Sequence, residues 1–387
     1  AEEAYRLLRA ASPVPAIFGG PHISVDGERF LAGKENVVGV RGDGWQTLWD
    51  LVRGAAGIKG QVIEGAPTND LDSLPWPDWK LFEKDAYREW ESGTYTIVTS
   101  RGCPFGCSFC AAGLASGARF RARSPENVVA EVEHACQTGF RQISVMDDTF
   151  NADVERAKEI CRRLIASPRV RARFNFANGL RADRFDAELA DLMAQVGAFY
   201  ICFGYETAND ELRKSVKPGM KTDTVLNAVR LCEERKMRTA VNLIIGHPEE
   251  TAEMAEESLR FARTCPSSMV NVYGLIPFRG TRAWSVLEEM MAQGRARLLY
   301  PEAEYTARIT PQSGHPVFET DVFPRHARRR ALLAGRRITQ KRALVNLLGP
   351  WLGLLAHGLT LNPRVFNLVY NLRDTMLGSK LFVALVR

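Results

Sequence analysis

Three cysteines, Cys103, Cys107 and Cys110, lie within eight residues in the segment TSRGCPFGCSFCAAG. Three thiols fit neither a disulfide, which joins two thiols, nor a closed structural zinc site, which takes four ligands. No second cysteine pair or nearby histidine completes such a set. An iron–sulfur cube offers four corners, so three thiolates hold three irons and leave the fourth open to another ligand. Gly102 and Gly106 are expected to permit the tight wrap of such a loop.

The other five cysteines are not clustered. Each stands alone among apolar residues, where a small buried side chain is the usual interpretation. The chain lacks the cysteine pattern of secreted proteins and shows no signal peptide, so we expect a cytoplasmic protein in which a cysteine cluster binds metal or is redox-active. The isolated cysteines are Cys136, Cys161, Cys202, Cys232 and Cys265.

The composition is that of an ordinary globular protein, with 45% hydrophobic and 25% charged residues among 387. This length suffices for two or three domains. The net charge of +6 is local, because residues 325–342 carry eight Lys and Arg and no acid; without those eight the chain has a charge of about −2. A nucleic-acid-binding protein more often spreads basic and aromatic residues over one face, so we expect no nucleic-acid partner.

Strand and helix patterns alternate regularly after residue 93. Ser124 and Pro125, for example, supply the cap and the first turn of one intervening helix. Six strands, each followed by a helix, predict an α/β fold whose parallel sheet curls into a partial (β/α)6 barrel of the TIM type, with its chemistry at the carboxyl ends of the strands. The expected strands are Tyr95–Thr99, Gln142–Met146, Arg173–Ala177, Phe199–Phe203, Thr239–Ile245 and Val270–Leu275.

The cysteine motif at the end of the first of these strands resembles that of the radical S-adenosylmethionine (SAM) superfamily. The resemblance implies that Cys103, Cys107 and Cys110 hold a 4Fe–4S cluster whose open iron binds the amino and carboxylate groups of SAM. It also implies reductive cleavage of SAM to a 5′-deoxyadenosyl radical, with electrons from a donor such as flavodoxin or ferredoxin. The alternative of a different class is a non-catalytic protein whose thiols bind zinc or serve structure.

Polar residues follow the next strands where this family binds SAM. Asp147 and Asp148 end the second strand, where the family holds the amino group of SAM, and carboxylates suit an ammonium group; Asp148 could instead cap the next helix. Asn178 and Arg181 follow the third strand and could contact the SAM carboxylate or the substrate, although Arg181 could equally form a surface salt bridge. Glu206 ends the fourth strand, where the family uses a polar residue for the ribose hydroxyls.

The fifth strand ends in NLIIGHPEE, which resembles the family's G-x-I-x-G-x-x-E element beside the adenine. The match runs from Asn242 through Gly246 to Glu249, and it is partial because Asn242 replaces the first glycine. Phe109, directly before Cys110, occupies the aromatic position that packs near the adenine in the family. LIPFRGT after the sixth strand resembles the family's P-x-x-G-T segment.

Residues 1–65 alternate helix and short strand, which predicts a doubly wound α/β unit. The segments GGPH and GDGW, followed by DLDSLPWPDW, resemble the branch of the superfamily with an N-terminal Rossmann-like cobalamin-binding domain. The resemblance implies that Gly19, Gly20 and His22 line the pocket for the cobalamin tail. The family's Asp-x-His-x-x-Gly loop, whose histidine binds cobalt, is not found in the sequence. Three explanations are open: the loop lies in a preceding segment, cobalamin binds without a protein ligand, or this chain binds no cobalamin. Since the sequence begins inside the predicted domain, we expect the loop to lie in a preceding segment.

Residues 66–92, rich in Pro and Asp, are expected to form a linker, and residues 93–317 the barrel. Residues 318–387 are expected to form a basic and apolar helical region. Its apolar run, 343–359, falls short of the ~20 residues of a membrane span. It is interpreted as a helical cap over the barrel or, with the basic residues of 325–359, as a peripheral contact with an anionic membrane. A cap that closes the barrel mouth would favour an apolar substrate.

These features predict a radical SAM enzyme that functionalises an unactivated carbon. Most of the cobalamin branch transfers a methyl group, so the first expectation is cobalamin-dependent methylation of an apolar natural product, tetrapyrrole or lipid-like molecule. Rearrangement, cyclisation and oxidation are the alternatives within the superfamily. A tRNA methylthiotransferase matches less well, because no cysteine precedes Cys103 and the tail is helical.

Overall fold

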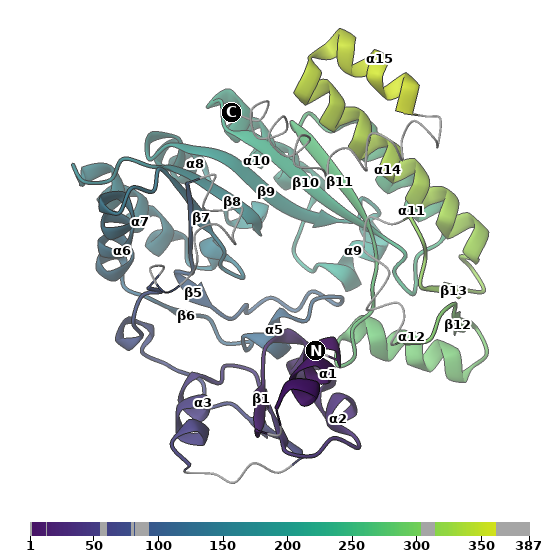
Figure 1. The fold of residues 1–387 in the computed structure, drawn as a ribbon. Helices are drawn as coiled ribbons and strands as arrows, with labels where there is room; N and C mark the ends of the chain where they lie inside the picture. The colour runs from purple at the N-terminus through teal and green to yellow at the C-terminus, as the bar shows by residue number, and fades with distance from the viewer. Residues whose placement is uncertain are drawn as a thin grey trace.

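A sheet of six parallel strands forms the centre of the protein, seen in a computed structural model that describes residues 2–12, 14–54, 60–78, 81, 93–302 and 314–360 (Figure 1). Strands that follow one another in the chain are neighbours in this sheet, which is curled. Its two edge strands do not pair with each other within the described residues. The predicted partial (β/α)6 barrel is confirmed. Its strands are β4 (Thr94–Ile97), β7 (Gln142–Val145), β8 (Arg173–Leu180), β9 (Ala198–Glu206), β10 (Arg238–Ile245) and β11 (Met269–Gly274).

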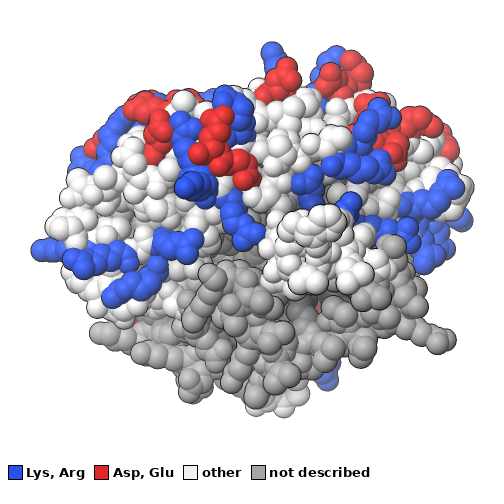
Figure 2. Space-filling model, turned by 90° about the horizontal axis from the view of Figure 1, so that it is seen from above, with Lys and Arg blue, Asp and Glu red and all other residues white. Residues whose placement is uncertain are grey.

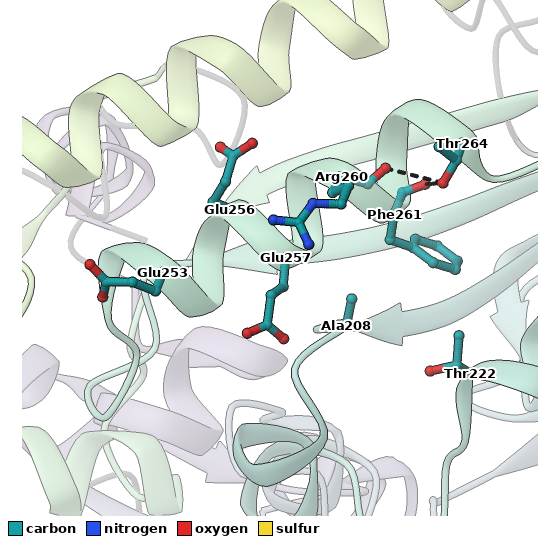
Figure 3. Close-up of a pocket in the computed structure, with 8 residues that line it drawn as sticks. All are labelled: Ala208, Thr222, Glu253, Glu256, Glu257, Arg260, Phe261 and Thr264. Atoms are coloured by element: carbon teal, nitrogen blue, oxygen red, sulfur yellow. Dashed lines mark hydrogen bonds between the residues drawn. The ribbon is translucent and has the colours of Figure 1, made fainter.

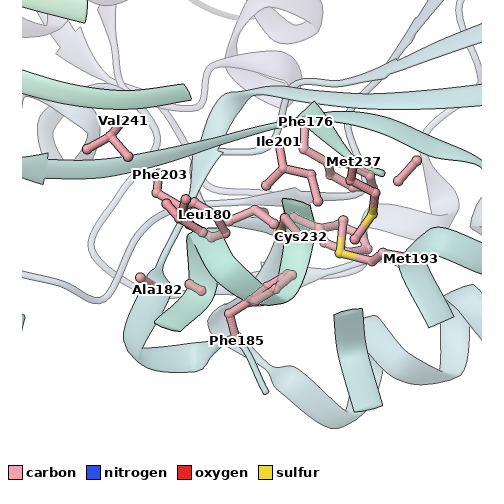
Figure 4. Close-up of a cluster of buried hydrophobic side chains, with 14 of the residues drawn as sticks. Phe176, Leu180, Ala182, Phe185, Met193, Ile201, Phe203, Cys232, Met237 and Val241 are labelled. Carbon is pink, nitrogen blue, oxygen red and sulfur yellow. The ribbon is translucent and has the colours of Figure 1, made fainter. Parts of the chain in front are cut away.

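Helices cover the outer face of the curled sheet, and alternate strand side chains pack beneath them in one hydrophobic core. Figure 4 shows part of this core, where Phe176 and Phe203 of the sheet lie with Met193 and Cys232 of the helices. All five isolated cysteines are buried, as predicted. The helices of this layer are α6 (Pro125–Gln137), α7 (Val154–Ala166), α8 (Ala187–Gln195), α10 (Thr222–Glu234) and α11 (Ala252–Thr264). The short helix α9 (Asp210–Val216) contributes no residue to this core.

Side-chain caps fix where these helices begin. Ser124 Oγ accepts a hydrogen bond from Asn127 N at 3.1 Å, and Pro125 occupies the first turn, as predicted. Asp186 and Thr251 cap α8 and α11 in the same way. Each cap satisfies a backbone N–H that the first turn leaves without an intrahelical partner. The caps therefore fix the path of the loops that leave the carboxyl ends of the strands.

The N-terminal part is a smaller parallel sheet in the order β1-β2-β3, with helices around it (Figure 1). The sequence pattern located four of its elements: α1 (Glu2–Ala11), β1 (Ala16–Phe18), β2 (Val37–Arg41) and α3 (Trp45–Val52). It missed β3 (Gln61–Glu64), which is short and incompletely buried, and α2 (Pro21–Leu31). Helix α2 was hidden because Gly27 and a non-helical Asp26 interrupt its pattern.

The described part of the C-terminal region is helical, as predicted, but it lies elsewhere than over the barrel mouth. After α12 (Arg282–Ala292), strands β12 (Ala296–Leu298) and β13 (Phe318–Thr320) form an antiparallel hairpin that leads into α14 (Arg325–Leu348) and α15 (Pro350–Thr360). Helix α14 packs along β11 and α11 on the outside of the barrel (Figure 1). The last residues of the predicted tail, 361–387, lie outside the described residues, as do residues 79–80 and 82–92 of the predicted linker.

The far end of α14 is attached to the amino-terminal end of β11. Arg342 donates to the carbonyls of Cys265 at 2.7 Å and Ser267 at 2.6 Å, and Asn346 donates to Ser268 O at 2.6 Å. These residues directly precede β11, so α15 follows at the end of the barrel opposite the cysteine loop. The expectation that the described part of this region closes the mouth is therefore wrong. The basic run is also partly structural, because Arg328 and Arg342 donate to backbone carbonyls.

Figure 2 shows basic and acidic side chains intermixed on much of one face of the molecule. No helix within the described ranges is both long enough and apolar enough to cross a membrane.

Two small residues of α14 allow it to cover the edge strand β11. Thr339 Oγ1 donates to Val270 O at 2.9 Å and accepts from Val272 N at 3.2 Å, so one hydroxyl satisfies two backbone groups of the edge. A Cβ at Gly335 would lie only 2.3 Å from Val272 Cγ1. The close contact between helix and strand thus requires glycine at this position.

We predict that Gly335→Ala lowers the free energy of unfolding by about 1–3 kcal/mol, because the added methyl group forces α14 away from β11. Gly358→Ala is the matched control, since it lies in a helix and its Cβ would meet no atom within 4 Å. That control gains helix propensity without a clash and should be neutral or stabilising. Urea denaturation of both variants measures the difference, and equal stability of the two would refute the close-packing explanation.

Candidate active site

The cysteine loop leaves the carboxyl end of β4. Its first residues form β5 (Ser100–Arg101), which pairs antiparallel with β6 (Arg121–Ala122) and so closes the loop on itself. Within the loop Cys103 and Cys107 are half-buried, Cys110 is exposed, and none of the three forms a disulfide. Cys103 N donates to Gly117 O at 3.2 Å, and Cys110 N donates to Cys107 O at 3.2 Å. Backbone hydrogen bonds therefore set the spacing of the thiols.

Glycine is required at the entrance of this loop. Gly102 has φ +83, and a Cβ there would lie 2.2 Å from Arg119 O. Gly106, which the sequence also suggested, has an ordinary φ and open space around it, so it is not needed for the wrap. Further along, Ser108 N donates to Val216 O at 3.0 Å, and Ala283 N donates to Ser108 O at 2.8 Å. The loop is thus tied to α9 and α12.

Asp147, at the end of β7, holds the start of the cysteine loop. Its Oδ1 accepts from Thr99 N at 2.6 Å, and its Oδ2 accepts from Thr99 Oγ1 at 2.6 Å and Ser100 Oγ at 2.5 Å. Burial raises the pKa of this carboxyl, although the hydrogen bonds from Ser100 and Thr99 oppose the rise. Both oxygens are engaged by the protein, so Asp147 is a structural residue of this loop and not a free partner for an ammonium group.

The next residues of the β7 loop contact the cysteine loop as well. Asp148 is half-buried, and its Oδ2 accepts from Gly102 N at 2.9 Å. The helix after it is capped by Asp153, so Asp148 does not serve as that cap. Thr149 Oγ1 lies 3.3 Å from Cys103 Sγ. Asp148 therefore lies beside the cysteines, and its contact with SAM stays a prediction.

The two predicted residues of β8 and its loop differ in environment. Asn178 is exposed, and its amide donates to Asp147 O at 2.6 Å. Arg181 is buried and forms a bidentate pair with Asp183, with both N–O distances 2.8 Å. Its guanidinium also stacks on Phe105 of the cysteine loop, 3.9 Å from the ring centroid. Arg181 thus forms a salt bridge, but a buried one that supports the loop.

A buried ion pair follows β9. Glu206 is 6% exposed with φ +76, and its Oε1 lies 3.1 Å from Lys217 Nζ. Lys217 also donates to Gly204 O at 2.6 Å. Burial raises the pKa of Cys107 to about 11, and the nearby Lys217 charge opposes that rise. Sequence reasoning identified Glu206 and missed Lys217, because a lysine eleven residues further along gives no local sign of this pairing.

The turn after β10 is held by an acid next to the predicted one. Glu249 is exposed, whereas Glu250 is fully buried and accepts through Oε2 from Gly246 N and His247 N, the latter at 3.1 Å. Asn242 lies within β10 and accepts from Asn271 of β11 at 3.0 Å. The two glutamates are adjacent in the sequence, and only the direction of the turn decides which one is buried.

Phe109 packs against the same turn. Its ring meets His247 edge-to-face, with centroids 6.0 Å apart, and it also packs on the small core around Leu275 and Ala283. His247 is 1% exposed, and neither ring nitrogen makes a well-formed hydrogen bond with a described residue. Burial, with a smaller contribution from the charge of Arg328, lowers the pKa of His247 to about 3. This histidine is therefore neutral near pH 7.

The predicted N-terminal residues lie at the carboxyl end of β1. Gly19 and Gly20 follow the strand, and His22 is exposed in the first turn of α2. Ser24 Oγ donates to Gly20 O at 3.1 Å and accepts from Gly42 N at 2.9 Å, which joins the loops after β1 and β2. A Cβ at Gly20 or Gly42 would meet nothing within 4 Å, so both backbones are open to a ligand.

One aspartate connects this end of the N-terminal sheet to the cysteine loop. Asp43 Oδ1 lies 3.0 Å from Arg101 Nη1, and its Oδ2 lies 2.8 Å from Arg121 Nη1. Burial raises the pKa of Asp43, but the two guanidinium groups outweigh that effect and hold it below its usual value. Arg101 directly precedes Gly102 and Cys103. The glycine turn after β2 and the cysteine loop are therefore joined by buried charge pairs.

A pocket of about 600 Å³ lies elsewhere, on the outer helical layer (Figure 3). Its polar lining is built by side chains of α11, and Thr264 donates within that helix to Arg260 O and Phe261 O. It contains none of the predicted site residues. The residues that line it are Ala208, Thr222, Glu253, Glu256, Glu257, Arg260, Phe261 and Thr264.

The buried neutral His247 predicts a pH effect on stability. Between pH 6.5 and about 3 the unfolded chain binds a proton at this position and the folded chain does not, so the contribution of His247 to stability falls as pH falls through that window, while the raised pKa of Glu250 acts in the opposite direction. From pH 6.5 to about pH 5 the loss is on the order of 2 kcal/mol. We expect His247→Phe to lose less over the same interval. Urea denaturation at both pH values measures it, and parallel losses in variant and wild type would contradict a buried neutral imidazole.

The sequence of this chain is similar to those of known proteins. Residues 97–262 match the Radical SAM superfamily. An uncharacterized methyltransferase of Pyrococcus horikoshii is 27% identical over 304 residues, which cover 73% of this chain and 66% of the relative. Cytidylyl-2-hydroxyethylphosphonate methyltransferase of Streptomyces wedmorensis is 27% identical over 58% of this chain and 44% of the relative. The chain thus spans about two thirds of the first relative and less than half of the second.

Solved structures share the fold. The radical SAM methyltransferase TsrM of Kitasatospora setae, with cobalamin and a [4Fe-4S] cluster bound, aligns over 78% of this chain and 65% of its own, with a TM-score of 0.63 and 24% identity. The cobalamin-dependent radical enzyme OxsB aligns over 72% of this chain and 42% of its own, with a TM-score of 0.54 and 17% identity. Both place the six-stranded barrel in the same class of fold.

Proposed function

We propose that this chain holds a 4Fe–4S cluster on Cys103, Cys107 and Cys110 and cleaves SAM reductively. The observation that carries the proposal is the position of three thiols outside any disulfide on the first strand-end loop of a radical SAM domain. Such a cluster, when bound, supplies the electron that cleaves the sulfonium of SAM to give a 5′-deoxyadenosyl radical. Flavodoxin or ferredoxin is the proposed electron donor.

The chemistry of the loop is compatible with a cluster. Among the described residues, no three His, Cys, Asp or Glu side chains are grouped closely enough to hold one metal ion. A 4Fe–4S cube does not require three side chains around one ion, because each thiolate binds its own iron. Ala112 N donates to Cys110 Sγ at 3.4 Å, and such a hydrogen bond favours a thiolate and tunes the metal that it binds. Thr149 Oγ1 lies 3.3 Å from Cys103 Sγ and donates its own proton to Asp148 O.

The proposed SAM contacts come from successive strand ends. Asp148 beside the cysteines is the proposed partner of the SAM ammonium group, and Asn178 presents an exposed amide nearby. Glu206, held by Lys217, is the proposed acceptor for the ribose hydroxyls, since a carboxylate can accept from two vicinal donors. Lys217 supports the site by holding that carboxylate in place. Asp147 and Arg181 are given supporting roles, because protein groups already engage them.

The turn after β10 is proposed to lie beside the adenine of SAM. Gly246 and the backbone around it form the turn, Phe109 packs against it, and Asn242 lies within the strand that leads to it. Glu249 is exposed, so Glu250 replaces it in this proposal as the residue that shapes the turn.

Cobalamin is proposed as the second cofactor, held by residues 1–65. Gly19, Gly20 and His22 lie at the carboxyl end of a parallel strand, where ligands of such sheets bind. The open backbone at Gly20 is compatible with close approach of a ligand. The charge pairs of Asp43 would keep that ligand at a fixed position relative to the cysteine loop. When bound, methylcobalamin would supply the methyl group.

The proposed outcome is methyl transfer to a small molecule, as the names of several relatives suggest. A cyclase remains the second candidate, because two anaerobic magnesium-protoporphyrin IX monomethyl ester cyclases also match the chain. The composition of the C-terminal region no longer favours an apolar substrate, because its described part lies away from the mouth. The chain's own part is to orient the reactants and exclude water.

Anaerobically reconstituted protein, incubated with methyl-labelled SAM, a low-potential reductant and cobalamin, tests the proposal. We expect 5′-deoxyadenosine and label transfer to cobalamin or substrate. Deoxyadenosine without label transfer would overturn the methyltransferase part alone. A colourless protein with stoichiometric zinc would overturn the whole proposal.

Each of Cys103→Ala, Cys107→Ala and Cys110→Ala should reduce bound iron well below the ~4 per chain of an intact cluster and abolish deoxyadenosine formation. Cys136→Ala, which removes a buried thiol of α6, is the matched control and should keep both. Iron analysis and product chromatography give the two readouts. Iron content in the loop variants equal to that of Cys136→Ala would contradict ligation by the loop.

A further inference from the structure

The turn after β10 is held through its carbonyl groups by an arginine from the C-terminal region. Arg328, in α14, donates from Nη1 to Gly246 O at 2.7 Å and from Nη2 to His247 O at 3.2 Å. It is 1% exposed and lies 82 residues further along the chain than Gly246. Residues 97–262 match the radical SAM superfamily, so Arg328 lies outside the matched range.

The same turn is held through its N–H groups by Glu250. One carboxylate oxygen accepts from both Gly246 N and His247 N, and this side chain is fully buried. Gly246 has φ +103, and a Cβ there would lie 3.1 Å from Arg328 Nη1. Gly246 has a left-handed backbone conformation, and Glu250 and Arg328 together fix its two adjoining peptide groups in one orientation.

Arg328 is itself held in place by its own segment. Its Nε donates to Phe323 O at 2.8 Å, and its Nη2 lies 3.3 Å from Thr320 Oγ1. The guanidinium also lies over the rings of Phe318 and Phe323, 4.3 and 4.8 Å from their centroids. Burying a guanidinium is costly unless its donors are satisfied, and here four hydrogen bonds and two aromatic faces satisfy them.

The fixed turn is next to the cysteine loop. His247 packs against Phe109, and Phe109 directly precedes Cys110. Leu275 N donates to Ile245 O at 2.9 Å, which extends the contact between β10 and β11 up to the turn. A shift of the turn would thus move the surface that faces the cysteines.

We propose that Arg328 is a positioning residue for SAM: by holding the 246–247 turn, it sets the backbone against which the nucleoside end of SAM packs. The inference rests on the proposed function, since it requires that the chain binds SAM. Arg328 does not touch SAM in this scheme. It acts through the carbonyl groups of Gly246 and His247, so the C-terminal region becomes part of the SAM site without lining it.

The chain offers a matched control in Arg342. It lies on the same helix and also donates to backbone carbonyls, those of Ala262, Cys265 and Ser267. Its contacts are at the other end of the barrel, away from the cysteine loop. Arg328→Gln and Arg342→Gln therefore remove the same kind of interaction from one helix, and they differ in which end of the barrel loses it.

The test is equilibrium dialysis of labelled SAM against the reconstituted, unreduced protein, with iron content and unfolding midpoint measured on the same samples. We expect Arg328→Gln to weaken SAM binding about tenfold or more while keeping its iron, because small displacements of supporting groups have effects of this size. Arg328→Lys, which cannot reach both carbonyls and Phe323 O together, should weaken binding in the same direction. Arg342→Gln should lower the unfolding midpoint and leave SAM affinity unchanged.

Unchanged SAM affinity in Arg328→Gln, or an equal loss in Arg342→Gln, would overturn the inference and leave the proposed function intact. If Arg328→Gln does not fold, Arg328→Lys decides by the same comparison. Wild-type protein that carries its cluster and binds no SAM would overturn both the inference and the proposed function.

Discussion

The cysteine loop depends on one buried carboxylate. Asp147 ends β7 and binds the backbone and hydroxyl of Thr99 and the hydroxyl of Ser100, the two residues that begin the loop. Parallel strands bring their carboxyl ends to one edge of the sheet, so a short acid on the second strand can fix the loop of the first. Without that link the start of the loop would lose one of its attachments to the barrel, and those made by Asp148 and Ser108 further along the loop would remain.

The segments before and after residues 97–262 also contact this edge of the sheet through charged side chains. Asp43 pairs with Arg101 directly before the cysteine motif, and Arg328 donates to the carbonyls of the turn after β10. The Asp43 carboxylate and the Arg328 guanidinium are both largely buried and hydrogen-bonded, which is the condition under which such groups can be kept in a protein interior. The N-terminal sheet and the C-terminal helix are thus both connected to the loops on which the proposed chemistry depends.

The strands and the cysteine site could be predicted from the sequence because both are local patterns. Apolar runs such as Phe199–Phe203 have the length of buried parallel strands, and three cysteines within eight residues form a recognisable motif. Helix α2 could not be predicted, because Gly27 sits where a helix former is expected. The contacts of Lys217 with Glu206 and of Arg328 with Gly246 could not be predicted either, since partners 11 and 82 residues apart leave no local sign.

The sequence alone also could not indicate which of the adjacent residues Glu249 and Glu250 is buried. Both follow His247 within three residues, and only the path of the turn decides which carboxylate points inward. The basic run of α14 is partly structural, because Arg328 and Arg342 donate to backbone carbonyls of the barrel, and nothing in the sequence indicates these contacts.

Electron paramagnetic resonance of the reduced, reconstituted protein, recorded before and after addition of SAM, tests the central claim most directly. If the three thiolates leave one iron open, we predict the signal of a reduced 4Fe–4S cluster whose g values shift when SAM binds that iron. A reduced cluster whose spectrum SAM does not change, or the lack of any cluster signal in wild-type protein, would contradict it.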